Sequence, residues 1–367
     1  MKDQNATKLL AKVMGWEDPE PVRTYVPVLQ LLADYKYDHY QRFSPGRRFI
    51  ESLALWLNQF DIADRATALE FVTDRLVYIS DAEFSHLVQT AYPDLIVQER
   101  IRLVAEEENM PGHQVGCITR KPRFNELRLK SLYLGLSDGA RTNELRRASN
   151  GEIGNEQIWH AYELGPDKVK DMIKDLGESL ENAGLSSKNA RFNLIWLMDD
   201  FSGSGNTYIR YEDDRFKGKL RKIYDQLHRG DGVIDISHYE VFLLLYAATR
   251  QAVDHIEYWS ERFTTENGYK PLQVRVMFTL EHQLSLTRAS TPALDALLRH
   301  ERYYDHAVWD KHLAVGGTQD ARLGFAACAL PVVLSHNTPN NSVYLLWGPE
   351  SMKKFFGLFP RVSRHRE

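Results

Sequence analysis

Cysteine is nearly missing from this 367-residue sequence, which contains only Cys117 and Cys328. Two cysteines do not make a disulfide framework, and neither has partners at the spacing of a zinc site. Such sparse use of cysteine is typical of proteins in a reducing compartment. We therefore expect a cytoplasmic protein.

Long apolar runs are missing as well. No stretch approaches the ~20 apolar residues that a membrane span requires. The N-terminal segment MKDQNATKLLAKVMGW has no apolar core followed by a small-residue cleavage site. We expect neither a secretory signal nor a membrane partner.

A strong excess of one charge is also lacking. The chain carries 46 Lys and Arg against 50 Asp and Glu, a formal net charge of −4. This balance gives no global electrostatic reason to expect nucleic-acid binding, although it leaves local basic clusters open. Hydrophobic residues make up 43% of the chain and charged residues 26%, which is typical of a globular protein.

Two patterns divide the chain. Apolar residues at helical spacing, such as Phe49, Leu53 and Trp56, predict a helical N-terminal subdomain over residues 1–115. Residues 108–125 contain Pro111, Gly112, Gly116 and Pro122 and are a candidate linker. Residues 125–367 are the expected second domain.

In that second domain, short apolar runs alternate with helical segments. The expected strands are residues 132–136, 194–198, 241–246, 274–278, 329–334 and 343–346. The expected helices are residues 167–180, 216–227, 251–263 and 292–299, the last with an N-cap Thr291 before Pro292. This alternation predicts an α/β fold with a Rossmann-like, mostly parallel sheet flanked by helices.

The most informative segment is 194–207, LIWLMDDFSGSGNT. A buried strand ends in Asp199 and Asp200 and continues into a loop of small residues. Ligands of open α/β sheets bind beyond the carboxyl ends of the strands, and loops of small residues turn backbone N–H groups toward a phosphate. The hydroxyls of Ser202, Ser204 and Thr207 add donors. Two acids beside an anion pocket suit a ligand with a phosphate at one end and ribose hydroxyls or magnesium at the other.

Other interpretations of this segment fit less well. A P-loop requires a GK[ST] sequence, which is absent, and a dinucleotide-binding fingerprint places its glycines before the acid rather than after it. An ordinary strand followed by a Gly/Ser loop, with both acids merely solvated, remains an alternative.

The same segment closely resembles the PRPP-binding motif of type I phosphoribosyltransferases. That motif is an apolar strand, two acids, three residues, Ser or Thr, Gly, any residue and Thr, and every position is filled here. The resemblance implies that Asp199 and Asp200 are catalytic residues that hold the ribose 2- and 3-hydroxyls, directly or through water on a Mg²⁺ ion. It implies a 5-phosphate-binding loop made of Ser202, Gly203, Ser204, Gly205, Asn206 and Thr207.

Three further segments are candidate parts of the site. By resemblance, the pyrophosphate-binding loop after the first core strand is Ser137, Asp138, Gly139, Ala140 and Arg141; an ordinary βα connection is the alternative. Residues 150–156 are either a mobile flap over the site or a surface loop. Near the C-terminus, polar residues that follow an expected strand either line the same sheet edge and contact a base or ribose, or build a tight turn: His336, Asn337 and Asn340.

Taken together, the helical front, LGLSDGAR, DDFSGSGNT, HNTPNNS and the LFPRVSRH end resemble one branch of this superfamily. That branch comprises phosphoribosyltransferase-like proteins of bacterial conflict systems, including those beside retron reverse transcriptases in anti-phage defence. The resemblance implies an antiviral effector restrained by partners such as a reverse transcriptase–noncoding RNA complex or a helix-turn-helix protein.

Two departures from the enzyme pattern stand out. Purine-salvage members of the superfamily carry an acidic general base within the loop, and Gly203 occupies that position here. Residues 208–215 are a poor helix start, so we expect an insertion between the loop and the next helix.

Three functions follow as alternatives. An enzyme would transfer or cleave at the anomeric carbon of PRPP or a related nucleotide, by positioning and charge stabilisation. A sensor would bind PRPP or a nucleotide in the same pocket without turnover and signal to a partner. A structural protein would have kept the fold and lost the site.

Overall fold

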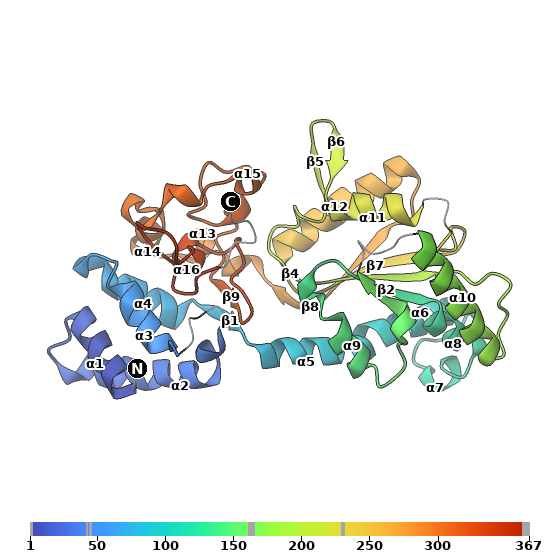
Figure 1. The fold of residues 1–367 in the computed structure, drawn as a ribbon, viewed down its shortest axis with the longest axis horizontal. Helices are drawn as coiled ribbons and strands as arrows, with labels where there is room; N and C mark the ends of the chain where they lie inside the picture. The colour runs from blue at the N-terminus through green and yellow to red at the C-terminus, as the bar shows by residue number, and fades with distance from the viewer. Residues whose placement is uncertain (1–2, 42, 44–45, 161–165, 229–231, 362–367) are drawn as a thin grey trace. The chain divides into compact units, whose positions relative to one another are not determined.

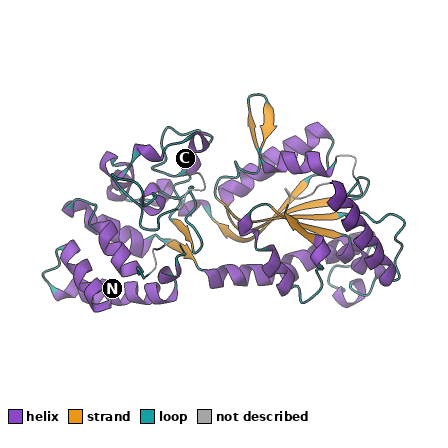
Figure 2. Ribbon diagram, in the orientation of Figure 1, coloured by secondary structure: helices purple, strands orange, loops and turns teal. Residues whose placement is uncertain are grey.

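A five-stranded parallel sheet is the largest sheet in the computed structural model, which describes residues 3–41, 43, 46–160, 166–228 and 232–361. Its spatial order is β3-β2-β4-β7-β8, and every neighbouring pair is parallel. Figure 2 shows the strands in orange. The strands are β2 Ser131–Gly135, β3 Ile158–His160, β4 Leu194–Ser202, β7 Glu240–Thr249 and β8 Leu272–Leu280. The predicted mostly parallel α/β sheet is confirmed. Only β3 was not predicted, because three half-buried residues give no readable apolar run.

Both faces of this sheet are covered, as the continuous apolar strands predict. On one face, alternate residues of β2, β4 and β7 pack against α10 Pro166–Asn182, α11 Lys219–Leu227 and α12 Arg250–Asn267. On the other face, Trp196 stacks on Phe242 at 4.4 Å, and Arg275 of β8 pairs with Glu99 of α6 Val97–Glu107. Figure 1 shows α11 and α12 on one side of the sheet and α6 on the opposite side.

The remaining elements of this part of the chain are short. They are the π-helical turn Tyr92–Ile96, α7 Val115–Ile118, α8 Pro122–Leu129, the 3₁₀ turn Asp138–Ala140, α9 Thr142–Ala148, the 3₁₀ turn Asn155–Gln157, β5 Arg210–Glu212 and β6 Arg215–Lys217. Strands β5 and β6 form an antiparallel hairpin directly after the expected phosphate loop. This hairpin is the insertion that the poor helix pattern of residues 208–215 predicts.

The chain divides into two compact units at positions other than the expected linker. Residues 85–280 form the unit that contains the sheet, and residues 1–84 combine with residues 281–367 to form the other. The first boundary falls within α5 Asp81–Ala91. The expected division at residues 115–125 therefore does not coincide with this one, because α6 and α8 pack with the sheet unit while the C-terminal segment joins the N-terminal helices.

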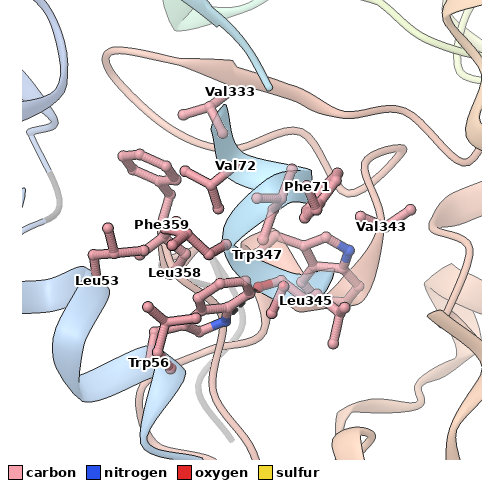
Figure 3. Close-up of a cluster of buried hydrophobic side chains, with 14 of the residues drawn as sticks. Leu53, Trp56, Phe71, Val72, Val333, Val343, Leu345, Trp347, Leu358 and Phe359 are labelled. Carbon is pink, nitrogen blue, oxygen red and sulfur yellow. Dashed lines mark hydrogen bonds between the residues drawn. The ribbon is translucent and has the colours of Figure 1, made fainter. Parts of the chain in front are cut away.

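Helices dominate the unit formed by the two chain ends. Its elements are α1 Asp3–Met14, α2 Pro19–Tyr35, the 3₁₀ turns Tyr37–His39 and Ile62–Asp64, α3 Phe49–Leu57, α4 Arg65–Asp74, β1 Val77–Ile79, the 3₁₀ turn His282–Leu284, α13 Leu286–Ala289, α14 Pro292–Arg299, the 3₁₀ turns Glu301–Tyr303 and His306–Val308, α15 Lys311–Ala314, the 3₁₀ turn Phe325–Ala327, β9 Val332–Leu334 and α16 Tyr344–Trp347. The two ends are joined by parallel pairing of β1 with β9 and by a shared apolar core. Figure 3 shows Leu53 and Trp56 of α3 beside Leu358 and Phe359.

Two sequence expectations in this unit have different outcomes. Thr291 caps α14 as predicted, since its side chain accepts a hydrogen bond from the Leu294 N–H. The strand expected at residues 343–346 is wrong, because residues Tyr344–Trp347 form the short helix α16. All four of its side chains are buried, and periodicity alone cannot distinguish a short strand from a helix in such a run.

The Glu99 ion pairs predict a pH dependence of stability. Burial raises the pKa of Glu99, but hydrogen bonds from Arg275 and Arg102 outweigh it and hold the pKa below its ordinary value. A lowered folded-state pKa contributes stability above the unfolded pKa, and this contribution is lost as the pH falls through the folded pKa. Glu99→Gln should lower the free energy of unfolding by about 2 kcal/mol at neutral pH.

Urea denaturation between pH 3 and 7 tests this expectation. The difference between the native chain and Glu99→Gln should shrink below about pH 4. The control is Glu178→Gln, whose exposed partner Lys174 lies 3.7 Å away, and it should change stability by less than ~0.5 kcal/mol. A difference that stays constant down to pH 3 would contradict the assignment.

Candidate functional site

The expected phosphate loop lies at the switch point of the sheet. After β2 the chain goes to β3 on one side, and it then returns to β4, β7 and β8 on the other side. Open α/β sheets bind ligands beyond the carboxyl ends of the strands that flank the switch point, which are β2 and β4 here. Asp199 and Asp200 lie near the carboxyl end of β4, and the loop follows this strand.

The loop is held closely against the end of β7 and the first turn of α12. The Thr249 hydroxyl donates to the Gly203 carbonyl at 2.8 Å and also caps α12. Gly205 has a φ of +78°, and a Cβ there would lie 2.9 Å from the Ala252 carbonyl oxygen. Only glycine fits this approach without strain.

Three N–H groups of the loop are available to an anion. The backbone N–H groups of Ser204, Gly205 and Thr207 donate to no group in the described part of the chain. By contrast, the Asn206 N–H donates to the Ser204 hydroxyl at 3.4 Å. Ser202 and Ser204 are buried and Thr207 is exposed, so the loop turns from the sheet toward solvent at its last residue.

Asp199 is an internal acceptor. Its side chain is almost fully buried, and one carboxylate oxygen accepts from the Tyr208 hydroxyl and the Lys219 ammonium, both at 2.8 Å. The other oxygen accepts from the Ser137 hydroxyl. Burial, followed by the nearby Asp200 carboxylate, raises the pKa of Asp199, while Lys219 and Ser137 act in the opposite direction. Burial also raises the pKa of Tyr208.

Asp200 is half-buried and faces the other expected loop. Its Oδ1 accepts from the Phe201 N–H at 2.8 Å. A Cβ added to Gly139 would lie 2.7 Å from the Asp200 carboxyl carbon, so the Gly139 backbone lies directly against this side chain. The structure therefore brings the predicted pyrophosphate loop and the acid pair together.

The pyrophosphate-loop candidates form a tight 3₁₀ turn. The Ser137 hydroxyl accepts from the Gly139 N–H at 3.1 Å, and Asp138 and Ala140 complete the turn. Arg141 adopts a left-handed conformation with φ 47° and pairs with Glu144 at 3.1 Å. Ser137 thus joins this turn to Asp199, which links the two loops through one carboxylate.

Sequence reasoning missed Tyr208 and Lys219. Helix α11 begins where the loop ends, since the N–H groups of Lys219 and Leu220 donate to the carbonyls of Thr207 and Tyr208 at 3.1 and 2.9 Å. Residues 209–218 leave and return to this point as the hairpin. Tyr208 adjoins the motif, but the ten residues between Tyr208 and Lys219 make the ion pair of Lys219 with Asp199 unreadable from the sequence.

The two acids do not fit a magnesium ion held by both carboxylates. An ion bound to the inner oxygen of Asp199 would lie beside the Lys219 ammonium, which already contacts that oxygen. Among the described residues, no group of three or more His, Cys, Asp or Glu side chains is arranged to hold a metal. Asp200 differs from Asp199 in being half-exposed.

Residues 150–156 are held by several contacts. Glu152 accepts from the Tyr92 hydroxyl at 2.6 Å and from the buried Arg100 guanidinium at 3.4 Å. Ile153 is buried, and its N–H donates to the Ser149 hydroxyl at 3.1 Å. These contacts favour the surface-loop alternative over the mobile flap.

The C-terminal candidates belong to a different sheet. The strand before His336, Asn337 and Asn340 is β9, which pairs with β1 in the unit of the chain ends. The expectation that they line the edge of the same sheet as Asp199 is therefore wrong. In this segment, Thr338 is fully buried and its hydroxyl donates to the Phe359 carbonyl at 2.8 Å, so the segment packs the core. Of the LFPRVSRH end, residues 362–365 lie outside the described part.

A parallel sheet with an acid pair and a Gly/Ser/Thr loop at its switch point defines the phosphoribosyltransferase-like class of α/β proteins. The family model PRTase-CE matches residues 53–361, and the chain belongs to this family of phosphoribosyltransferase-like effectors. Comparisons with curated proteins and with solved structures find no match. Across the described residues, no helix is both long and apolar enough to cross a membrane.

Proposed function

We propose that the protein binds PRPP or a related ribose 5-phosphate nucleotide at the carboxyl ends of β2 and β4. One observation carries the proposal. Among the described residues, the backbone N–H groups of Ser204, Gly205 and Thr207 donate no hydrogen bond, and they lie in the loop that follows Asp200. The N–H groups and the Thr207 hydroxyl bind the 5-phosphate, and Asp200 accepts hydrogen bonds from the ribose hydroxyls.

The reaction that suits this arrangement is transfer or cleavage at the anomeric carbon. The turn at residues 137–141 lies against Asp200 and would hold the group that leaves the anomeric carbon. Asp199 is a positioning residue, because its carboxylate connects Ser137 of the turn to Tyr208, the residue that follows the phosphate loop. Catalysis would rest on positioning and charge stabilisation.

Sensing without turnover is the second candidate. Two features favour it: Gly203 occupies the position of the general base of purine-salvage members, and the Asp199 carboxylate accepts from three side-chain donors of the protein. In this case the bound nucleotide would change the contacts of the chain with a partner rather than react.

Magnesium would enter with the ligand. A ligand pyrophosphate supplies the oxygen ligands that Mg²⁺ prefers, and Asp200 can add one carboxylate. When bound, the ion neutralises the phosphates.

Calorimetric titration of PRPP with Mg²⁺ into the full chain tests the proposal. Saturable binding is expected, and Asp200→Asn should weaken it by about 10- to 100-fold, since a charged hydrogen-bond acceptor is lost. The circular dichroism and melting temperature of this variant should match those of the native chain, because the side chain is half-exposed. Absence of binding of any ribose 5-phosphate ester would overturn the proposal. If the ligand binds, chromatography of the mixture distinguishes the two candidate functions. Released base or pyrophosphate indicates turnover, and intact ligand indicates sensing.

Membership in an effector family supports a proposal for the cellular role. We propose that the ribose-phosphate site serves anti-phage defence, with the chain restrained by a partner such as a retron reverse transcriptase–RNA complex or a helix-turn-helix protein. Expression of the native chain and of Asp200→Asn in a phage-challenged host tests this role. Equal plaque counts with and without the native chain, in the presence of its genomic neighbours, would contradict it.

A further inference from the structure

A basic cavity lies beside the end of the phosphate loop. It has a volume of about 400 Å³, within the usual range of small-molecule sites. Its lining consists of Thr207, Arg210, Lys217, Gly218, Lys219, Arg221 and Lys222. Five of these seven residues are cationic and none is acidic, so the lining favours the binding of an anion.

The cavity shares a residue with the candidate ribose-phosphate loop and adjoins it. Thr207 is the last residue of the motif and also lines the cavity. Lys219 lines it too, and its ammonium contacts Asp199 at 2.8 Å. Arg210 donates to the Asn206 carbonyl at 3.4 Å. A group that extends outward from a 5-phosphate in the loop would therefore enter the cavity.

The cationic side chains can be redirected to a ligand at small cost. Lys217 pairs with Asp213 at 2.6 Å and with Glu212 at 3.2 Å, and Arg221 pairs with Asp225 at 3.4 Å. Asp213 is 71% exposed and Asp225 35%, and exposed pairs contribute only about 0.2–1 kcal/mol each. Lys222 has no ion-pair partner among the described residues.

The hairpin that forms one wall of the cavity is firmly anchored. Tyr211 of β5 stacks on Trp259 of α12 with ring centroids 5.8 Å apart, and Phe216 of β6 contacts Phe263 at 5.2 Å. These rings fix Arg210 and Lys217 relative to the loop. A preformed cavity of this kind loses little conformational entropy when it binds.

This geometry distinguishes between classes of ribose phosphate. The 5-phosphate of PRPP is the end of the molecule, so PRPP leaves a cavity beyond the loop unfilled. A nucleoside 5′-diphosphate carries a second phosphate on the outer side of the first. On the basis of the proposed function, we infer that the site takes nucleotides with at least two 5′-phosphates, whose outer phosphate binds Arg221, Lys222 and Lys217.

Matched titrations test this inference. Nucleoside mono- and diphosphates of the four common bases, with PRPP as reference, are titrated into the full chain at about 0.1 M salt, where exposed charges are only partly screened. For a nucleoside whose base the site binds, the diphosphate should bind at least about 10-fold more tightly than the monophosphate. This ratio corresponds to ~1.4 kcal/mol. Arg221→Gln/Lys222→Gln should reduce this ratio to about 3 or less, since charged hydrogen bonds are lost.

Lys170→Gln/Lys174→Gln is the matched control, because it also removes two positive charges. Both lysines are exposed on α10 in the same unit and lie outside the cavity lining, so the ratio should remain at its native value. Arg221 and Lys222 are both exposed, and their replacement should leave the melting temperature unchanged.

The outcomes separate the two proposals. If PRPP or a monophosphate binds while no diphosphate binds more tightly, the inference falls and the proposed function stands. If no ribose 5-phosphate ester binds, both fall. Tight binding of a 5′-phosphorylated oligonucleotide without any preference for diphosphates would overturn the inference in favour of a polynucleotide ligand.

Discussion

Replacing Gly218 by alanine should lower the free energy of unfolding by about 3 kcal/mol, as expected for strained backbone combined with a steric clash. Gly218 has a φ of +120°, a conformation that L-residues rarely adopt. An added Cβ would also lie 2.7 Å from the Tyr208 carbonyl carbon. The added Cβ is bonded directly to the backbone and the Tyr208 carbonyl carbon is part of it, so no side-chain rotation relieves the clash. The backbone between β6 and α11 must therefore shift, and this shift displaces Lys219.

Gly268→Ala separates the two causes. Gly268 ends α12 with a φ of +67°, and no atom lies within 4 Å of the position of an added Cβ. This variant should therefore lose only about 1 kcal/mol, the conformational part of the cost. Urea denaturation followed by tryptophan fluorescence measures both. Equal losses in the two variants would mean that the approach of Gly218 to Tyr208 does not constrain the loop.

Gly139→Ala should reduce the affinity for PRPP by about 100-fold, the cost of displacing one charged hydrogen-bonding group. The added methyl group would occupy space 2.7 Å from the carboxyl carbon of Asp200. Because the Asp200 side chain is short, it can avoid the methyl group only by turning away from the ribose position. Calorimetry with PRPP and Mg²⁺ measures the effect.

The matched control is Gly154→Ala. There an added Cβ would lie 2.8 Å from an oxygen of Glu156, which is an exposed and longer carboxylate outside the site. Glu156 can swing into solvent, so affinity and stability should both remain close to native. If Gly139→Ala binds PRPP as well as the native chain does, then Asp200 does not contact the ligand.

The loop and its sheet could be predicted from the sequence because the information is local. The strand, the acid pair and the small residues of the loop are contiguous from Leu194 to Thr207. Four apolar runs gave four strands of the sheet, since strands that are buried on both faces are apolar throughout. The insertion after the loop was also predictable, because charged and aromatic residues replace a helix start there.

Other features required contacts between distant segments. The roles of Asp199 and Asp200 looked equal in sequence, yet Asp199 is an internal acceptor because Lys219, Tyr208 and Ser137 converge on it. The partnership of the C-terminal segment with the first helices was equally hidden, since β9 pairs with β1 across some 250 residues of chain.

The sequence by itself determined the α/β class and the position of the candidate ribose-phosphate loop, because a short motif and the apolar periodicity encode them directly. Only the tertiary structure decided which acid is buried among protein donors, which is half-exposed, and where the basic cavity lies. Both depend on the hairpin that returns Lys219 to Asp199 and gathers five cations beside Thr207. No local sequence pattern predicts that these side chains come together, because tertiary packing, rather than sequence spacing, sets the distances between them.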